Sequence, residues 1–313
     1  MISFYNEEAI TSIQNDAYNS FSLLDQYDGE IGTCKKMIDL GKFKAEYQNF
    51  ALVYSRYLHE ANQTIVRNEK EYLNYLSEKN YPVVTVYGNA FVVEQKLEQP
   101  RLAMLMQYIP GVFIEAKTAA PLNILILAAL LGIPARAHQE AWLALNQNHL
   151  AANIIQAMDQ PQNFSQLQEK ANILAKNFQA LIQKMEQDQI MICDLQMIIS
   201  KDGRLTIIDP LDIVDYSSAK SLFKNEIQDP TPDLRQFLQH TKSWLKNALD
   251  FCQTIAQSST PTDLHAFVSV TPKALTFQHD AMTQKKKARS RVEMLRGTET
   301  NTPLSSLSIT NKM

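Results

Sequence analysis

Glycine is scarce in this chain, with 8 in 313 residues, against about 7% in an average protein. Each glycine is therefore expected to be placed for a structural reason rather than by chance. Cysteine is scarcer still: Cys34, Cys193 and Cys252 are odd in number and widely separated. This pattern excludes a disulfide framework and a CxxC metal knuckle, and it is typical of a reducing compartment such as the cytoplasm.

Long hydrophobic runs and a strong net charge are missing as well. The most apolar run, 122–133, has 12 residues and includes Asn123, whereas a membrane-spanning helix needs about 20. The first ten residues have neither the basic region nor the apolar region of a secretory signal peptide. A net charge of −3 draws the chain neither to nucleic acid nor to anionic lipid. We therefore expect a soluble protein with no transmembrane segment and no nucleic-acid partner.

The first third of the chain alternates between helical and strand patterns. Residues 1–20 suit a short helix, and residues 21–56 hold three short β-compatible runs, FSLL, TCKKMI and NFALVYS. Residues 61–79 have apolar side chains at helical spacing. Two further strand-like stretches follow and end at Pro110-Gly111. We expect a β-rich unit over 21–111, preceded by an N-terminal extension over 1–20.

The rest of the chain is mainly helical. A hairpin is predicted over 190–213, because an Asp-Gly turn separates two apolar runs. Residues after about 272 are polar, and 285–291 carry five cations, which predicts a mostly disordered basic tail able to bind an acidic partner or an activator. The expected units are 112–257 and the tail 258–313, and the fold class is α+β. The predicted helices are 121–132, 135–157, 163–188 and 231–257.

Two aspartates in the predicted hairpin are the main candidates for chemistry. Asp194 and Asp209 each end an apolar run and lie 15 residues apart across the turn. An acid at the end of a buried strand is costly unless it serves a metal, a hydrogen-bond network or a reaction. Phosphoryl transfer uses such a pair, one to orient the acceptor hydroxyl and one to hold a metal ion. A pair of turn or capping aspartates is the alternative.

The order of motifs around these aspartates resembles the protein kinase superfamily, from about Phe21 to Ile213. The resemblance implies a two-lobed fold with a small β-rich N-lobe and a larger helical C-lobe. It also implies ATP and Mg²⁺ or Mn²⁺ as cofactors. The segments that carry it, in order, are GEIGTCKK at 29–36, FALV at 50–53, NEKEYL at 68–73, NYP at 80–82, MLMQYIPG at 104–111, ICDL at 192–195 and IDPL at 208–211.

By this resemblance, the nucleotide binds in a cleft beneath the turn formed by Gly29 and Gly32. Its adenine is expected to bond to the backbone of Gln107 and Ile109, with Met106 behind it as gatekeeper.

The chemistry implied by the same resemblance falls on three acids. Asp194 orients the acceptor hydroxyl, Asp209 holds the metal ion, and Glu69 pairs with the cation that binds the phosphates.

The chain departs from the family's pattern at several of these positions. Val53 stands where the family has its phosphate-binding lysine, no His or Arg precedes Asp194, and Phe-Gly does not follow Asp209. The family's metal-binding asparagine is expected five residues after the catalytic aspartate, where this chain has Ile199. The Asp-Leu-Gln and Ile-Asp-Pro segments are similar to those of divergent kinase-like effectors of bacterial pathogens.

Three cations are candidates for the missing positive charge. Lys35 and Lys36 follow the glycine turn, and alternation along a strand turns only one of them toward the cleft. Arg56 lies three residues beyond Val53. Gln196, two residues after Asp194, offers an amide that could contact phosphate or support the metal site, but no charge.

The sequence therefore favours an atypical ATP-dependent protein kinase, cytoplasmic or, if secreted as an effector, in the cytosol of a host cell. Its substrate would be a protein hydroxyl. Three alternatives remain open at this point. The chain could be a pseudokinase that acts as a binding or scaffold module, a phosphotransferase for small molecules like the aminoglycoside and choline kinases, or a helical interaction protein unrelated to kinases.

Overall fold

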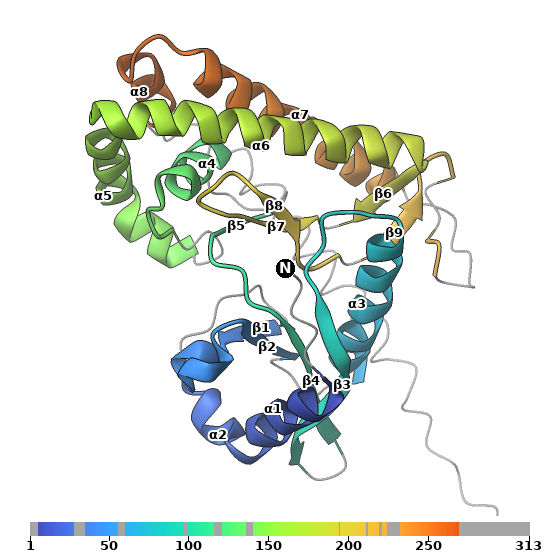
Figure 1. Cartoon of the computed structure of the whole chain (residues 1–313). Helices are drawn as coiled ribbons and strands as arrows, with labels where there is room; N and C mark the ends of the chain where they lie inside the picture. Colours follow the sequence, from blue (N-terminus) through green and yellow to red (C-terminus); the bar gives the residue numbers. More distant parts are fainter. Residues whose placement is uncertain are drawn as a thin grey trace, which may run out of the picture. The chain divides into compact units, whose positions relative to one another are not determined.

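The computed structural model describes most of the first 268 residues. The chain divides into a compact unit, 1–269, and a second unit, 270–313. The second unit, which includes the predicted basic run, lies wholly outside the described residues. The first unit contains an antiparallel sheet region and a helical region, so the predicted α+β class is confirmed (Figure 1). The described residues are 6–27, 35–55, 60–96, 99–115, 121–135, 140–193, 195–210, 212–218, 221–223 and 232–268.

A four-stranded antiparallel sheet forms the first region. Its strands are β1 (Lys35–Asp39), β2 (Phe50–Ser55), β3 (Val86–Lys96) and β4 (Gln99–Gln107), in the order β1-β2-β4-β3. Two short 3₁₀ helices, Leu40–Lys42 and Ala45–Tyr47, connect β1 to β2. The sequences of β2 (FALVYS) and β3 (VYGNAFVVEQK) are rich in β-branched and aromatic residues, which suit a pleated surface. β2 is buried along its whole length.

Two helices cover one face of this sheet. Helix α1 (Glu7–Asn19) begins at Asn6, whose side chain accepts a hydrogen bond from the Ala9 amide, and α2 (Phe21–Leu24) follows at once. The prediction of a strand at 21–24 is therefore wrong, since a four-residue apolar run fits one helical turn equally well. Apolar residues of both helices form one core cluster with the sheet: Ile13, Ala17, Phe21, Leu24, Ile38, Phe50, Leu52, Tyr54, Val93, Ala103 and Leu105.

Helix α3 (Glu60–Glu78) follows β2 and contacts β2, β3 and β4. The helical spacing that predicts it over 61–79 places Val66, Leu73 and Leu76 on its buried side. Residues of α3 do not belong to the cluster around α1 and α2, so this helix packs the sheet through a separate set of contacts.

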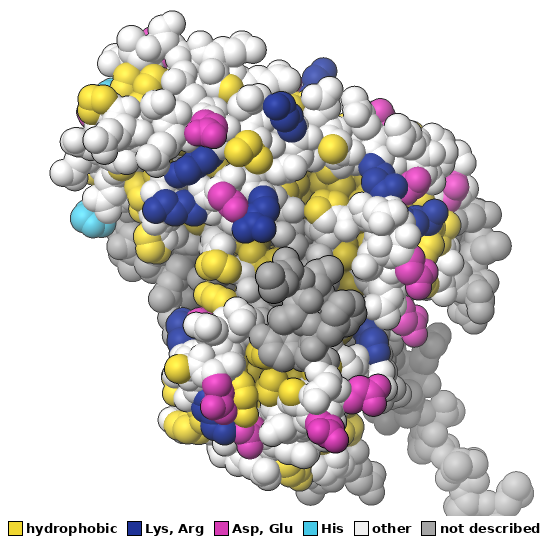
Figure 2. Space-filling model, viewed as in Figure 1, with side chains coloured by type: hydrophobic (Ala, Val, Ile, Leu, Met, Phe, Trp, Pro, Cys, Tyr) yellow, Lys and Arg dark blue, Asp and Glu magenta, His cyan; other side chains and the backbone are white. Residues whose placement is uncertain are grey.

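The helical region contains α4 (Leu122–Leu131), α5 (Glu140–Met158), α6 (Pro161–Gln187), α7 (Pro232–Gln257) and α8 (Thr262–Val268). Seven consecutive residues of α4, 124–130, are buried, which confirms that the most apolar run is a core helix. The long helices α6 and α7 pack along one another (Figure 1). Of the helices in the described ranges, none is both long and apolar enough to span a bilayer. On the face drawn in Figure 2, acidic and basic side chains are interspersed.

The predicted hairpin over 190–213 consists of two separate pairs of short strands. β6 (Ile190–Cys193) pairs with β9 (Asp212–Asp215), whereas β7 (Gln196–Ile199) pairs with β8 (Leu205–Ile207). β5 (Val112–Glu115) extends the second pair into a three-stranded sheet, β5-β7-β8. The Asp-Gly turn joins β7 to β8 as predicted. Each apolar run is thus interrupted once, at 194–195 and at 208–211.

A short backbone connection ties the two regions together. The loop after α3 lies beside β8, where the Ile207 amide donates to the Pro82 carbonyl (2.7 Å) and the Val84 amide donates to the Ile207 carbonyl (2.9 Å). Val83 and Ile207 form a parallel β-bridge. Backbone bonds of this kind have directional requirements, so they fix the position of the loop against β8.

The turn between β7 and β8 contains Gly203, whose replacement should destabilise the protein. Gly203 has a φ of 81°, and a Cβ there would lie 2.5 Å from the Lys170 carbonyl oxygen. Gly203→Ala should therefore lower the free energy of unfolding by more than about 1 kcal/mol. Asp202→Ala is the matched control: the exposed pair between Asp202 and Arg204 contributes less than about 1 kcal/mol. Urea denaturation of both variants checks this, and equal midpoints would contradict it.

Candidate active site

Asp209 lies in the interruption between β8 and β9 and is only 8% exposed. The residue before it, Ile208, donates its amide to the Gln196 carbonyl (3.1 Å), so this interruption lies beside the start of β7. A carboxylate this deeply buried is costly unless it is used for binding or hydrogen bonding. The structure therefore supports the prediction's premise that Asp209 is not an ordinary surface turn residue.

The opposite interruption, between β6 and β7, is short. Only Asp194 and Leu195 separate Cys193 from Gln196. Asp194 itself lies outside the described residues, so its predicted role remains a prediction. Ile199, five residues further on, is fully buried inside β7. Position 199 therefore lies inside a strand rather than in the link between β6 and β7.

Gln196 is the first residue of β7 and is 8% exposed. The ladder places it opposite Glu115 of β5 on one side and beside Ile208 on the other. Its Oε1 atom is buried and accepts no hydrogen bond from any described residue. Sequence reasoning identified Gln196 only by its distance from Asp194 and did not anticipate this unpartnered oxygen, which depends on burial.

Glu69 is buried in α3, with 2% of its surface exposed. The neighbouring strand β2 carries Val53, which is also buried and pairs with Met37 of β1 and Met104 of β4. The expected lysine position in this strand is thus occupied by an apolar core residue. Glu69 is thus a buried acid on a helix that contacts this strand.

The two lysine candidates occupy adjacent positions of β1. Lys36 is opposite Tyr54 and donates through Nζ to the Asp25 carbonyl (2.5 Å), on the side of α2. Its ammonium also lies 3.9 Å from the Asp25 carboxylate. Lys35 is opposite Ser55, and alternation along the strand puts its position on the other face, with Val53. Arg56 lies outside the described residues.

The predicted adenine-binding segment lies at the end of β4. Met106 is buried, and the Gln107 amide donates to the Thr85 carbonyl (2.8 Å). The next residue, Tyr108, donates its amide to the Asn49 carbonyl (2.8 Å), on the side of β2. Because hydrogen-bonding directions alternate along a strand, the amide and the carbonyl of Gln107 both point away from β2. The Gln107 carbonyl is thus left as the acceptor, and the Ile109 amide has no backbone acceptor among the described residues. An acceptor and a donor two residues apart are what an adenine edge requires.

The segment after β9 returns to α3. Ser221 donates to the Asp212 carboxylate (2.8 Å), and the Phe223 ring makes edge contacts with Tyr72 (4.8 Å) and Tyr75 (5.3 Å) of α3. Burial, with the nearby Asp212 charge, raises the pKa of Tyr72 to about 12, so its phenol stays neutral. The sequence analysis missed this contact because Phe223 lies about 150 residues from its partners.

Asp215 has a local role. Its carboxylate accepts hydrogen bonds from the amides and hydroxyls of Ser217 and Ser218 (2.7–3.1 Å), which lower its pKa to about 2. It is therefore a turn-capping aspartate.

Across the described ranges, His, Cys, Asp and Glu side chains form no group of three or more that would hold a metal ion. Asp209 therefore has no two further ligands of these types beside it among the described residues.

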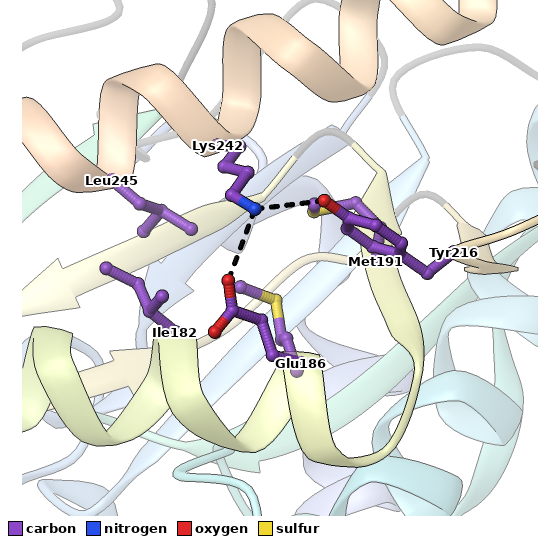
Figure 3. Close-up of a pocket in the computed structure, with 7 residues that line it drawn as sticks. Ile182, Glu186, Met191, Tyr216, Lys242 and Leu245 are labelled. Atoms are coloured by element: carbon purple, nitrogen blue, oxygen red, sulfur yellow. Dashed lines mark hydrogen bonds and ion pairs between the residues drawn. The ribbon is translucent and has the colours of Figure 1, made fainter.

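A small apolar depression lies elsewhere, between α6, α7 and β6 (Figure 3). Lys242 crosses it and bonds to Tyr216 (3.0 Å) and to Glu186 (3.2 Å). Met191 and Leu245 form part of its apolar lining. None of the predicted site residues lines this depression, so it is separate from the site around Asp209.

No protein-family model matches this chain, and no curated protein sequence matches it. The candidate function therefore follows from the site's own chemistry and geometry.

The contact of Phe223 with α3 generates a prediction. Each edge-to-face ring pair contributes about 0.5–1.5 kcal/mol beyond the area it buries, so Phe223→Ala should open α3 more often. We expect amide hydrogen exchange over 60–78 to become about tenfold faster. Leu222→Ala, which removes the exposed neighbouring side chain, should leave exchange there unchanged. Equal exchange in wild type and Phe223→Ala would contradict a role for the ring in holding α3.

Proposed function

We propose that this protein is an atypical ATP-dependent kinase that transfers the γ-phosphoryl group of ATP to a hydroxyl of a protein substrate. The observation that carries the proposal is the pair of interruptions between β6 and β7 and between β8 and β9. One contains Asp194, and the other contains Asp209, a residue that is only 8% exposed. Two acids in such paired breaks can act on the two ends of one transferred phosphoryl group.

The nucleotide would occupy the space between the sheet region and these interruptions. The Gln107 carbonyl and Ile109 amide supply the two hydrogen bonds that adenine needs, and the buried Met106 lies next to them. The turn with Gly29 and Gly32, which lies outside the described residues, would cover the phosphates. The two-lobed architecture of protein kinases accommodates this arrangement of sheet, helix α3 and strand pairs.

The proposed reaction is a direct transfer. Asp194 orients the acceptor hydroxyl and accepts its proton while the oxygen bonds to the γ-phosphorus and the bond from that phosphorus to the ADP oxygen breaks. Asp209 would hold Mg²⁺ or Mn²⁺, which neutralises the charge on the phosphate oxygens. Glu69 would position the cation that replaces the missing lysine, and the register of β1 favours Lys35 for it.

A binding module without catalysis is the second candidate. Lys36 is held by Asp25, and an apolar side chain occupies the lysine position at Val53. If neither Lys35 nor Arg56 supplies the charge, the phosphates lack the positioning on which phosphoryl transfer depends. The fold would then serve as a pseudokinase scaffold.

Replacing Asp209 and replacing Asp194 should impair different steps of the reaction. Asp209→Asn should remove the metal-dependent part of ATP binding, because it weakens the metal ligand. Asp194→Asn should keep nucleotide affinity and lower phosphate transfer about 10²–10⁴-fold, because its acid acts on the acceptor. Asp215→Asn, at the turn that it caps, is the matched control and should retain both. Binding is measured with a fluorescent ATP analogue, and transfer with γ-labelled ATP and a generic protein acceptor. Phosphate transfer at the wild-type rate by Asp194→Asn would contradict the role of Asp194 as the catalytic base.

The substitute cation can be identified by single replacements. Lys35→Ala should weaken ATP binding and lower transfer, whereas Lys36→Ala should alter neither, because Lys36 faces Asp25. Arg56→Ala tests the remaining candidate. A loss matched in Glu69→Gln would identify the paired cation. If the wild-type protein transfers no phosphate and all three variants bind ATP as it does, the pseudokinase hypothesis replaces that of an active kinase.

A further inference from the structure

Strand β3 contains a bulge that lies against helix α1. Between the cross-strand pairs formed by Tyr87 and Phe91, β3 has three residues where β4 has one. The first of the three, Gly88, has a φ of 67°, and a Cβ there would lie 3.1 Å from Gln14 Nε2 of α1. Bulges redirect a strand locally and are placed features rather than defects. This one favours glycine, both for its φ and because α1 comes close to the backbone.

The next residue of the bulge, Asn89, is bonded to helices α1 and α3. Its backbone carbonyl accepts a hydrogen bond from Gln14 Nε2 of α1 (3.2 Å). Its side-chain Oδ1 accepts one from Lys70 Nζ of α3 (2.5 Å). Both helices also pack against β3 (Figure 1). Through two groups of one residue, the bulge therefore joins the amino-terminal helix to α3.

The bond from Asn89 reaches α3 next to its buried acid. Lys70 directly follows Glu69, which is 2% exposed. Successive residues of an α-helix point about 100° apart, so Lys70 reaches Asn89 while Glu69 stays buried. A hydrogen bond from a charged donor is stronger than one between neutral groups. The bond between Asn89 and Lys70 thus restrains the turn of α3 that carries Glu69.

We propose that Asn89 is a positioning residue, which holds α3 through Lys70 and so places Glu69 for the cation that binds the phosphates. This inference rests on the proposed function, because the nucleotide site gives Glu69 that partner. Gln14 supports the same arrangement from α1, since it holds the backbone of the bulge from which the Asn89 side chain projects. The amino-terminal helices thus influence phosphate transfer through the sheet.

Asn89→Ala removes the acceptor for Lys70 and is the main test. Loss of a hydrogen bond to a charged group shifts an equilibrium about tenfold, so α3 should hold Glu69 in place for less of the time. We expect kcat for transfer from γ-labelled ATP to a generic protein acceptor to fall about tenfold. The full chain is assayed well below the melting temperature of each variant, and circular dichroism checks that each is folded. A residue that only supported the fold would leave the kcat of the folded protein unchanged.

Three further variants define the contact. Asn89→Asp keeps an oxygen for the Lys70 ammonium and should retain the wild-type kcat. Gln14→Ala, which releases the bulge from α1, should lower kcat by a smaller factor, because its bond joins two neutral groups. Asn74→Ala replaces an exposed asparagine of the same helix; it is the matched control and should leave kcat unchanged.

The possible results distinguish the proposal from its alternatives. A wild-type kcat in Asn89→Ala, together with loss of metal-dependent ATP binding in Asp209→Asn, would overturn the role of Asn89 and leave the proposed function standing. An equal loss in Asn89→Ala and Asn89→Asp would also overturn that role, since the oxygen would then not matter. A wild-type kcat in Gln14→Ala would overturn the part assigned to α1. A wild-type protein that transfers no phosphate would overturn both the proposed function and this inference.

Discussion

The backbone bonds between the loop after α3 and β8 are the constraint on which the candidate site depends. Ile207 donates to Pro82 and accepts from Val84, so its strand is joined both to β7 and to the end of α3. Asp209 lies two residues beyond Ile207, and Glu69 lies in the helix that leads to Pro82. Both acids therefore belong to segments that lead into the same pair of backbone bonds. Side-chain contacts alone would define this relation less closely, because they lack the direction of backbone bonds.

Around this anchor, polar groups are buried at few places. Glu69, Gln196 and Asp209 are among the buried polar side chains of the described region, and each belongs to an element that reaches the bridge or its strand pair. The remaining surroundings are apolar, including β2, the strand where a phosphate-binding lysine was expected. A low-dielectric surrounding strengthens charge interactions at the few polar positions. The same surrounding makes any unpaired polar atom there costly.

Much of the fold could be predicted from the sequence because its signals are local. Helical spacing gave α3, α4, α6 and α7 within a few residues, and the Asp-Gly turn gave the β7–β8 connection. Phe21–Leu24 was misassigned because four residues carry no period. Asp209 was identified by the apolar run before it. The unpartnered oxygen of Gln196 and the Phe223 contact could not be predicted, because burial and distant pairing are set by the whole fold.

The position of α1 has a consequence for the order of folding. Gln14 donates to the Asn89 carbonyl, 75 residues later, and Ile13 and Ala17 share a core with Leu105 of β4. During synthesis, this core cannot be completed until Leu105, more than eighty residues after the first helices, has left the ribosome. Contacts so far apart in sequence slow folding and leave apolar surface exposed in the meantime. The apolar faces of the amino-terminal helices are therefore expected to stay exposed until β4 has been made.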